Sequence, residues 1–90
     1  MLNLNCVDVL KLVKVGLTDD QFSVLVDYLQ DKRIETIVVS SNKLTERACL
    51  ELQEKEMPGV RNLYMGRNKV QKAKIKDQIR ELETKYALYI

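Results

Sequence analysis

The chain has 90 residues, of which 46% are hydrophobic and 31% are charged, a composition typical of one small globular domain rather than of a disordered chain. The formal net charge is only +2, but residues 60–90 hold eight basic and three acidic side chains, so the basic character lies in the last third. The absence of histidine excludes Ser-His and Cys-His catalytic couples, and also zinc sites that need a histidine ligand.

The first predicted strand covers residues 7–12. Apolar residues alternate there, so that Leu10 and Leu12 face the core. Thr18 and Gln21 have the spacing of a capping box, and the two aspartates between them suit the positive end of a helix dipole. A helix should therefore start after Thr18. Its apolar face is expected to consist of Phe22, Leu25, Val26 and Leu29.

The second predicted strand covers residues 34–39, the most β-branched stretch of the chain. Thr45 is the expected N-cap of the second helix, with Glu46 just inside it. Pro58-Gly59 is expected to end that helix and to start the next turn. The apolar stripe of this helix comprises Ala48, Cys49, Leu52 and Met57.

The third predicted strand covers residues 60–65, and the third helix is predicted from about Lys72 to Lys85. The apolar face of this helix comprises Ile75, Ile79 and Leu82. Residues 86–90 are predicted to form a fourth strand, in which Leu88 and Ile90 take the inward places that Leu63 and Met65 hold in the third.

One spacing of apolar residues recurs through these units. The middle copy holds Ile34, Ile37, Val39, Asn42 and Leu44, the next copy lies 26 residues later as Val60, Leu63, Met65, Asn68 and Val70, and the earlier copy lies 27 residues before as Val7, Leu10, Leu12, Val15 and Leu17. The pattern L-x-x-L-x-L-x-x-N-x-L at this period is the signature of leucine-rich repeats. The chain therefore resembles that family, in its ribonuclease-inhibitor-like subclass with α-helices.

The resemblance implies a single domain over residues 1–90, a short right-handed α/β solenoid with about four parallel strands on the concave side and three helices on the convex side. Its repeat units would be residues 7–33, 34–59 and 60–85, with a partial unit at 86–90. It also implies that Asn42 and Asn68 bond the backbone of adjoining turns. Val15 departs from the asparagine pattern, which we attribute to the terminal position of that repeat.

The family usually binds protein partners on the concave sheet face, so the resemblance implies a non-enzymatic protein-protein interaction module. The candidate contact residues are those that alternate with the inward set: Val9, Lys11, Val13, Thr36, Val38, Asn62, Tyr64 and Tyr89, with Arg67 beside them. We expect Val38, Tyr64 and Tyr89 to act as anchors, while Lys11 and Arg67 steer the partner. The alternative is that these residues are ordinary β-formers on an exposed sheet.

A basic run surrounds the predicted start of the third helix and consists of Arg67, Lys69, Lys72, Lys74 and Lys76. Cations at a helix N-terminus oppose its dipole by roughly 0.3–1 kcal/mol each. The run therefore suggests an alternative function, the binding of an anionic partner such as a phosphate, an acidic protein or a nucleic acid. Nucleic acid is the less favoured of these, because no aromatic residue is interleaved with the lysines, and solvated surface lysines are the simplest reading.

A third alternative is self-association through terminal strands. Residues 2–7 and 86–90 lie close to the predicted outer strands, and exposed strand edges can pair with another chain. The chain would then be a homo-oligomer, or a part of a longer solenoid. A concentration-dependent melting temperature is expected in that case.

The spacing of the cysteines and glycines and the short length of the apolar runs exclude several further classes of protein. Cys6 and Cys49 form no C-x-x-C motif, which predicts two reduced thiols in a cytoplasmic protein and no metal site. Three scattered glycines make no phosphate-binding loop, so we expect no cofactor and no enzymatic activity. The longest apolar run has five residues, too short for a membrane span, and no signal peptide is expected.

Overall fold

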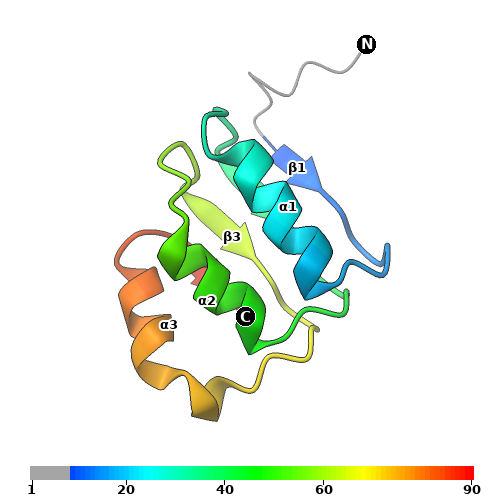
Figure 1. The fold of residues 1–90 in the computed structure, drawn as a ribbon, viewed down its shortest axis with the longest axis vertical. Coiled ribbons are helices and arrows are strands. Elements are labelled where there is room, and N and C mark those ends of the chain that lie inside the picture. Colours follow the sequence, from blue (N-terminus) through cyan, green and yellow to red (C-terminus); the bar gives the residue numbers. More distant parts are fainter. Residues whose placement is uncertain (1–8) are drawn as a thin grey trace.

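The computed structural model describes residues 9–90, in which four strands alternate with three α-helices (Figure 1). All neighbouring strands are parallel, in the order β1-β2-β3-β4. The predicted α/β class with a parallel sheet is therefore confirmed. The elements are β1 (Val9–Lys11), α1 (Asp19–Leu29), β2 (Thr36–Val38), α2 (Glu46–Glu54), β3 (Asn62–Tyr64), the 3₁₀ turn η2 (Lys72–Lys74), α3 (Lys76–Glu83) and β4 (Ala87–Tyr89).

The register of the sheet follows the repeat. The central residues of the four strands are direct neighbours: Leu10, Ile37, Leu63 and Leu88. Each strand has only three residues, fewer than predicted, because the chain soon bends away to reach the helices. Flanking residues still make single bonds to the next strand, as Val39 N–H does to the Tyr64 carbonyl at 2.8 Å. The predicted strand residues 7 and 8, the lead-in before them and Cys6 lie outside the described residues.

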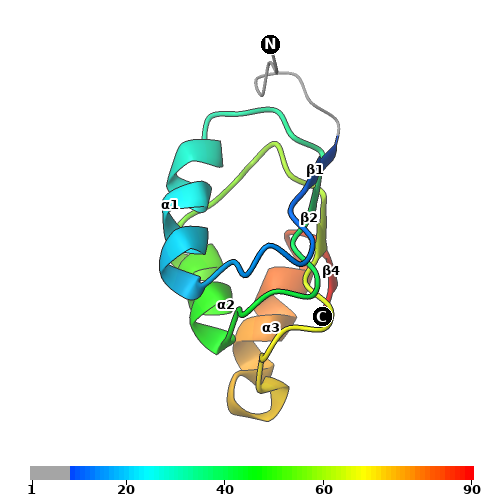
Figure 2. The same ribbon diagram turned by 90° about the vertical axis from the view of Figure 1, so that its right-hand side faces the viewer.

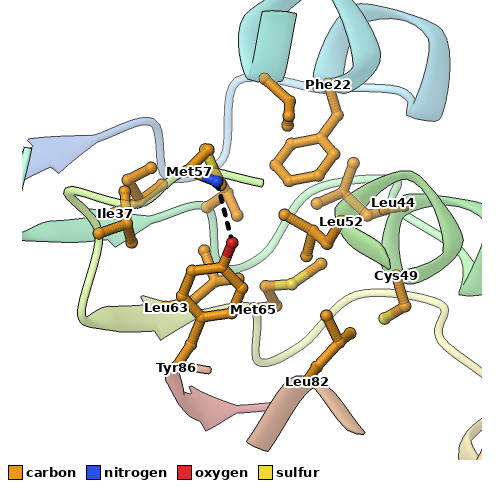
Figure 3. Close-up of a cluster of buried hydrophobic side chains, with 14 of the residues drawn as sticks. Phe22, Ile37, Leu44, Cys49, Leu52, Met57, Leu63, Met65, Leu82 and Tyr86 are labelled. Atoms are coloured by element: carbon orange, nitrogen blue, oxygen red, sulfur yellow. Dashed lines mark hydrogen bonds between the residues drawn. The ribbon is translucent and has the colours of Figure 1, made fainter. Parts of the chain in front are cut away.

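The molecule has two layers, with the helices on one side of the sheet (Figure 2). Parallel strands require crossover connections, and here each connection carries its helix across the same face. The core lies between the layers, where large side chains from both pack together (Figure 3). The fully buried members with the largest volumes include Phe22, Leu29, Ile37, Leu44, Leu52, Met57, Leu63, Met65 and Leu82.

The start of α1 is the capping box that the sequence predicts. Gln21 N–H donates to the Thr18 hydroxyl at 3.4 Å, and Thr18 N–H donates to the Gln21 side chain at 3.1 Å. These bonds satisfy two of the N–H groups that a helix start leaves without partners. The predicted apolar face is turned inward: Phe22, Val26 and Leu29 are buried, and Leu25 is half-buried against the core.

Helix α2 begins at the predicted N-cap, where the Thr45 hydroxyl accepts from Arg47 N–H at 3.3 Å. It ends at Glu54, earlier than the predicted end at Pro58-Gly59, because Lys55 already adopts an extended conformation. A further bond at the start of α2 has no signal in the sequence. Both carboxylate oxygens of the buried Asp19 accept from Thr45, one from its N–H at 2.9 Å and one from its hydroxyl at 2.6 Å.

Helix α3 differs from the prediction at both ends. It begins at Lys76 rather than Lys72 and ends at Glu83, and a separate 3₁₀ turn precedes it. The break falls at Ile75, whose backbone is not helical (φ −135°, ψ 37°) and whose side chain is buried in the core. Ile75 is β-branched, which slightly lowers its helix propensity, so the helix is easily interrupted where this side chain packs into the core.

The turns after the strands are joined by asparagine side chains, as the repeat pattern implies. Asn42 Oδ1 accepts from the N–H groups of Val15 and Leu17 in the preceding turn, at 3.0 Å each. Asn68 Oδ1 accepts in the same way from Asn42 and Leu44, again at 3.0 Å each. The two side chains therefore fix three successive turns to one another.

The three turns also share a backbone conformation. Lys14, Ser41 and Arg67 occupy equivalent positions and have positive φ values of 57°, 59° and 56°. Such a conformation is uncommon for residues other than glycine, and its recurrence indicates that one turn geometry is used three times. Val15 replaces the first asparagine, and the described residues hold no earlier turn to which an asparagine there could bond.

Tyr86 joins the last strand to the loop after α2. Its ring is buried in the core, and its hydroxyl oxygen accepts from Met57 N–H at 3.1 Å (Figure 3). The sequence predicts Tyr86 only as the first residue of the fourth strand. The bond gives the buried N–H of Met57 a partner that its own loop does not supply.

Candidate binding site on the open face of the sheet

The face of the sheet that points away from the helices is not covered by any element within residues 9–90 (Figure 2). Because strand side chains alternate between faces and the register is fixed, the outward residues form two rows across the strands. We call this surface the open face. Its first row is Val9, Thr36, Asn62 and Ala87, and its second row is Lys11, Val38, Tyr64 and Tyr89.

The second row ends in a pair of stacked tyrosines. The ring centroids of Tyr64 and Tyr89 lie 4.4 Å apart, with only 6° between the ring planes. Tyr64 is 36% exposed and Tyr89 is 50% exposed, so the stack presents aromatic surface to solvent. Each ring restricts the other, which lowers the entropy lost when a partner packs against them.

Beside the stack, Val38 is half-buried and Lys11 is exposed at the other end of the row. The first row is more polar, since Asn62 donates from its side-chain amide to the Thr36 hydroxyl at 3.2 Å. Val9 is exposed at the end of that row. The open face thus has an apolar and aromatic row next to a polar one.

The predicted contact residues fall into two groups. Seven of them come together in the two rows of the open face, as their alternation predicts: Val9, Lys11, Thr36, Val38, Asn62, Tyr64 and Tyr89. Val13 and Arg67 are exposed but lie beyond the ends of β1 and β3, at the edge where all four parallel strands have their carboxyl ends. These two residues border the rows rather than belonging to them.

The basic run spreads over three different pieces of structure. Arg67 and Lys69 lie in the turn after β3, Lys72 and Lys74 lie in η2, and Lys76 is the first residue of α3. All five side chains are exposed, and Lys74 lies 3.9 Å from the Glu46 carboxylate. The predicted opposition between the basic run and the helix dipole is wrong for four of the five residues, because only Lys76 belongs to α3, and the acidic Asp77 is in the same first turn.

The described residues hold little that resembles a reactive centre. Burial raises the pKa of the Cys49 thiol to about 11, with Asp19 and Glu46 adding to the shift, so this thiol is protonated and unreactive near neutral pH. In residues 9–90, no three side chains of the types that bind metals come together. No helix in that range is long and apolar enough to cross a bilayer.

No protein-family model, curated protein sequence or solved structure matches the chain. The candidate site is accordingly described by its geometry: a parallel sheet with one face open, a stacked tyrosine pair on that face, and cationic side chains at its borders.

Proposed function

We propose that the chain is a short leucine-rich-repeat-like solenoid that binds a protein partner on the open face and has no enzymatic activity. The repeated turn and the asparagine bonds at successive turns support this type of repeat. In this proposal the crossovers are right-handed, the helices form the convex side, and the open face is the concave side. A free, buried Cys49 fits the proposed cytoplasmic location.

The observation that carries the proposed binding role is the stacked pair of Tyr64 and Tyr89 on a face that no described helix covers. Tyrosine is enriched among residues that dominate protein interfaces, where truncation to alanine costs roughly 2 kcal/mol or more. Val38 extends the apolar surface of the pair within the same row. Lys11 lies at the far end of that row and would steer an approaching partner more than it would hold it.

The experiment is a comparison of two tyrosines with equal exposure on opposite layers. Peptides are selected from a displayed library against the wild-type chain, and their affinities are then measured for Tyr89→Ala and Tyr28→Ala. Both tyrosines are 50% exposed, but Tyr28 lies on α1. We expect Tyr89→Ala to weaken binding by about 30-fold, whereas Tyr28→Ala leaves it unchanged.

Tyr64→Ala serves as the second variant. Because Tyr64 is the stacking partner of Tyr89, we expect its loss to weaken peptide binding as well. Far-ultraviolet circular dichroism checks that both variants stay folded. If the selected peptides bind the Tyr89 and Tyr64 variants normally but lose affinity for the Tyr28 variant, the binding surface lies on the helices and the proposal is wrong.

A further inference from the structure

The turn after each strand directs two backbone N–H groups at a single oxygen atom. In the first turn the groups belong to Val15 and Leu17, and the oxygen is Asn42 Oδ1. In the second turn the N–H groups of Asn42 and Leu44 meet at Asn68 Oδ1. All four distances are 3.0 Å, so the turn geometry reproduces this two-donor arrangement closely.

The third turn has the same geometry. Arg67 has a φ of 56°, against 59° for Ser41 in the turn before. The side-chain amide of Asn68 donates to the carbonyl oxygens of Met65 and Gly66, at 3.0 and 3.3 Å. Asn42 Nδ2 makes the equivalent two bonds in the second turn, at 3.0 and 3.2 Å.

In the third turn, the two equivalent donors are the N–H groups of Asn68 and Val70. Within residues 9–90, neither group donates a hydrogen bond to a protein acceptor, and both residues are only half-buried. We call these two N–H groups the Asn68–Val70 clamp. The clamp is pre-shaped for one oxygen atom, because the same turn already holds one at two other places in the molecule.

The sequence neighbours of the clamp are cationic, although Glu46 lies 3.9 Å from Lys74 and Glu83 lines one pocket together with Lys72. Arg67 and Lys69 alternate with the clamp residues along the chain, and Lys72 follows two residues after Val70; all three side chains are exposed. From residue 60 to residue 76 the chain contains no acidic residue. Positive charge near a pair of aligned N–H groups favours an anionic acceptor over a neutral one.

We propose that the Asn68–Val70 clamp binds a side-chain carboxylate of an acidic polypeptide. In the two filled turns the oxygen belongs to a planar asparagine carboxamide, and the aspartate carboxylate has the same shape and size. A charged acceptor also makes shorter and stronger bonds to N–H groups than a neutral one. A tetrahedral phosphate lacks the planar shape of the acceptor groups in the filled examples.

This site is separate from the open face and does not depend on the proposed function. The clamp uses backbone groups of a turn at the carboxyl edge of the sheet, whereas the open face uses strand side chains. A partner could therefore engage either surface alone. The two proposals also fail independently, because Tyr89→Ala leaves the clamp unchanged.

The test uses three blocked peptides that differ only at a central aspartate, asparagine or valine. Amide proton shifts of the chain are followed by solution NMR during titration. We expect the aspartate peptide to move the amide protons of Asn68 and Val70 downfield, and the equivalent protons of Asn42 and Leu44, which are already bonded, to stay in place. Affinity should fall from aspartate to asparagine to valine, with about tenfold between the first and the last.

A matched pair of variants tests the role of charge. Lys69→Gln removes a cation beside the clamp, while Lys43→Gln removes the equivalent cation beside a filled turn. The two lysines occupy equivalent places, because the Lys69 N–H donates to the Leu44 carbonyl and the Lys43 N–H donates to the Leu17 carbonyl. We expect Lys69→Gln to weaken the aspartate peptide several-fold and to reduce its salt dependence, and Lys43→Gln to change neither.

Two results would overturn the proposal. In the first, the aspartate peptide shifts Asn68 and Val70 no more than it shifts Asn42 and Leu44. In the second, the aspartate and valine peptides shift the clamp equally. A response confined to Lys72, Lys74 and Lys76 that inorganic phosphate competes away would show unspecific anion binding, and would contradict the clamp in the same way.

Discussion

At the scale of single residues, the side chain of Asn42 connects two successive turns through several hydrogen bonds. Its side chain is buried, and it accepts from two N–H groups while donating to the Leu12 carbonyl at 2.6 Å and to the Val39 carbonyl at 3.0 Å. Backbone groups in a tight turn have few other partners. Loss of this side chain would leave several of them unpaired in a protein environment.

We therefore expect Asn42→Ala to lower the free energy of unfolding by about 3 kcal/mol, because each buried group left without a partner costs about 1–3 kcal/mol. Chemical denaturation followed by circular dichroism measures the change. The matched control is Asn62→Ala, since Asn62 is half-buried on the open face and its side chain makes one bond, to Thr36. Equal losses for the two variants would contradict the role assigned to Asn42.

The role of Asn42 and Asn68 was predictable from the resemblance to leucine-rich repeats, because an asparagine stands at the same position of the second and third turns, where the first turn has Val15. The Asn68–Val70 clamp was not predictable in the same way. Its donors are backbone groups, which every residue except proline carries, so the side-chain pattern contains no signal for them. Only the conformation of the turn, with Arg67 at a positive φ, brings the two N–H groups to one point.

At the scale of helices, α1 and α2 are joined by a buried polar contact as well as by apolar packing. Asp19 at the start of α1 accepts from both the N–H and the hydroxyl of Thr45, the N-cap of α2. Asp20 follows it in sequence but forms only an exposed ion pair with Arg47 at 3.1 Å. The neighbouring aspartates therefore have different energetic roles.

Asp19→Ala is expected to lower the free energy of unfolding by about 2–3 kcal/mol, because the helix N-cap loses its charged partner. Asp20→Ala should change it by less than about 1 kcal/mol, as is usual for exposed ion pairs. The comparison is made by urea denaturation of the two variants. A loss at Asp20 as large as that at Asp19 would show that the helix dipole, rather than the contact with Thr45, determines the effect.

The sequence predicted where α1 and α2 start but explained the aspartates only in part. A capping box is a local signal, so Thr18 and Gln21 identify the start of α1 without any other part of the fold. The contact between Asp19 and Thr45 spans 26 residues and exists only because the two helices lie side by side. The predicted start of α3 was wrong because it also depends on tertiary contacts. The packing of Ile75 against the core outweighs local helix propensity there.

At the scale of the whole molecule, each strand pairs with the next strand in the sequence, and each helix packs against the next helix. Pairing joins β1 to β2, β2 to β3 and β3 to β4, and helix packing joins α1 to α2 and α2 to α3. The register was predictable because a slip by one residue would expose the central apolar row. The stacking of Tyr64 on Tyr89 follows from that register, but the near-parallel ring planes required the structure.

In the proposed function, one face of the sheet is open to a partner. Solvent paramagnetic relaxation with a soluble gadolinium chelate, recorded by NMR over a range of protein concentrations, tests it most directly. The rings of Tyr64 and Tyr89 should relax strongly at every concentration, while the methyl groups of Ile37 and Leu63 stay protected. If the two tyrosines are as protected as Leu63, and become accessible only on dilution, then copies of the chain cover this face and it is not open to another partner.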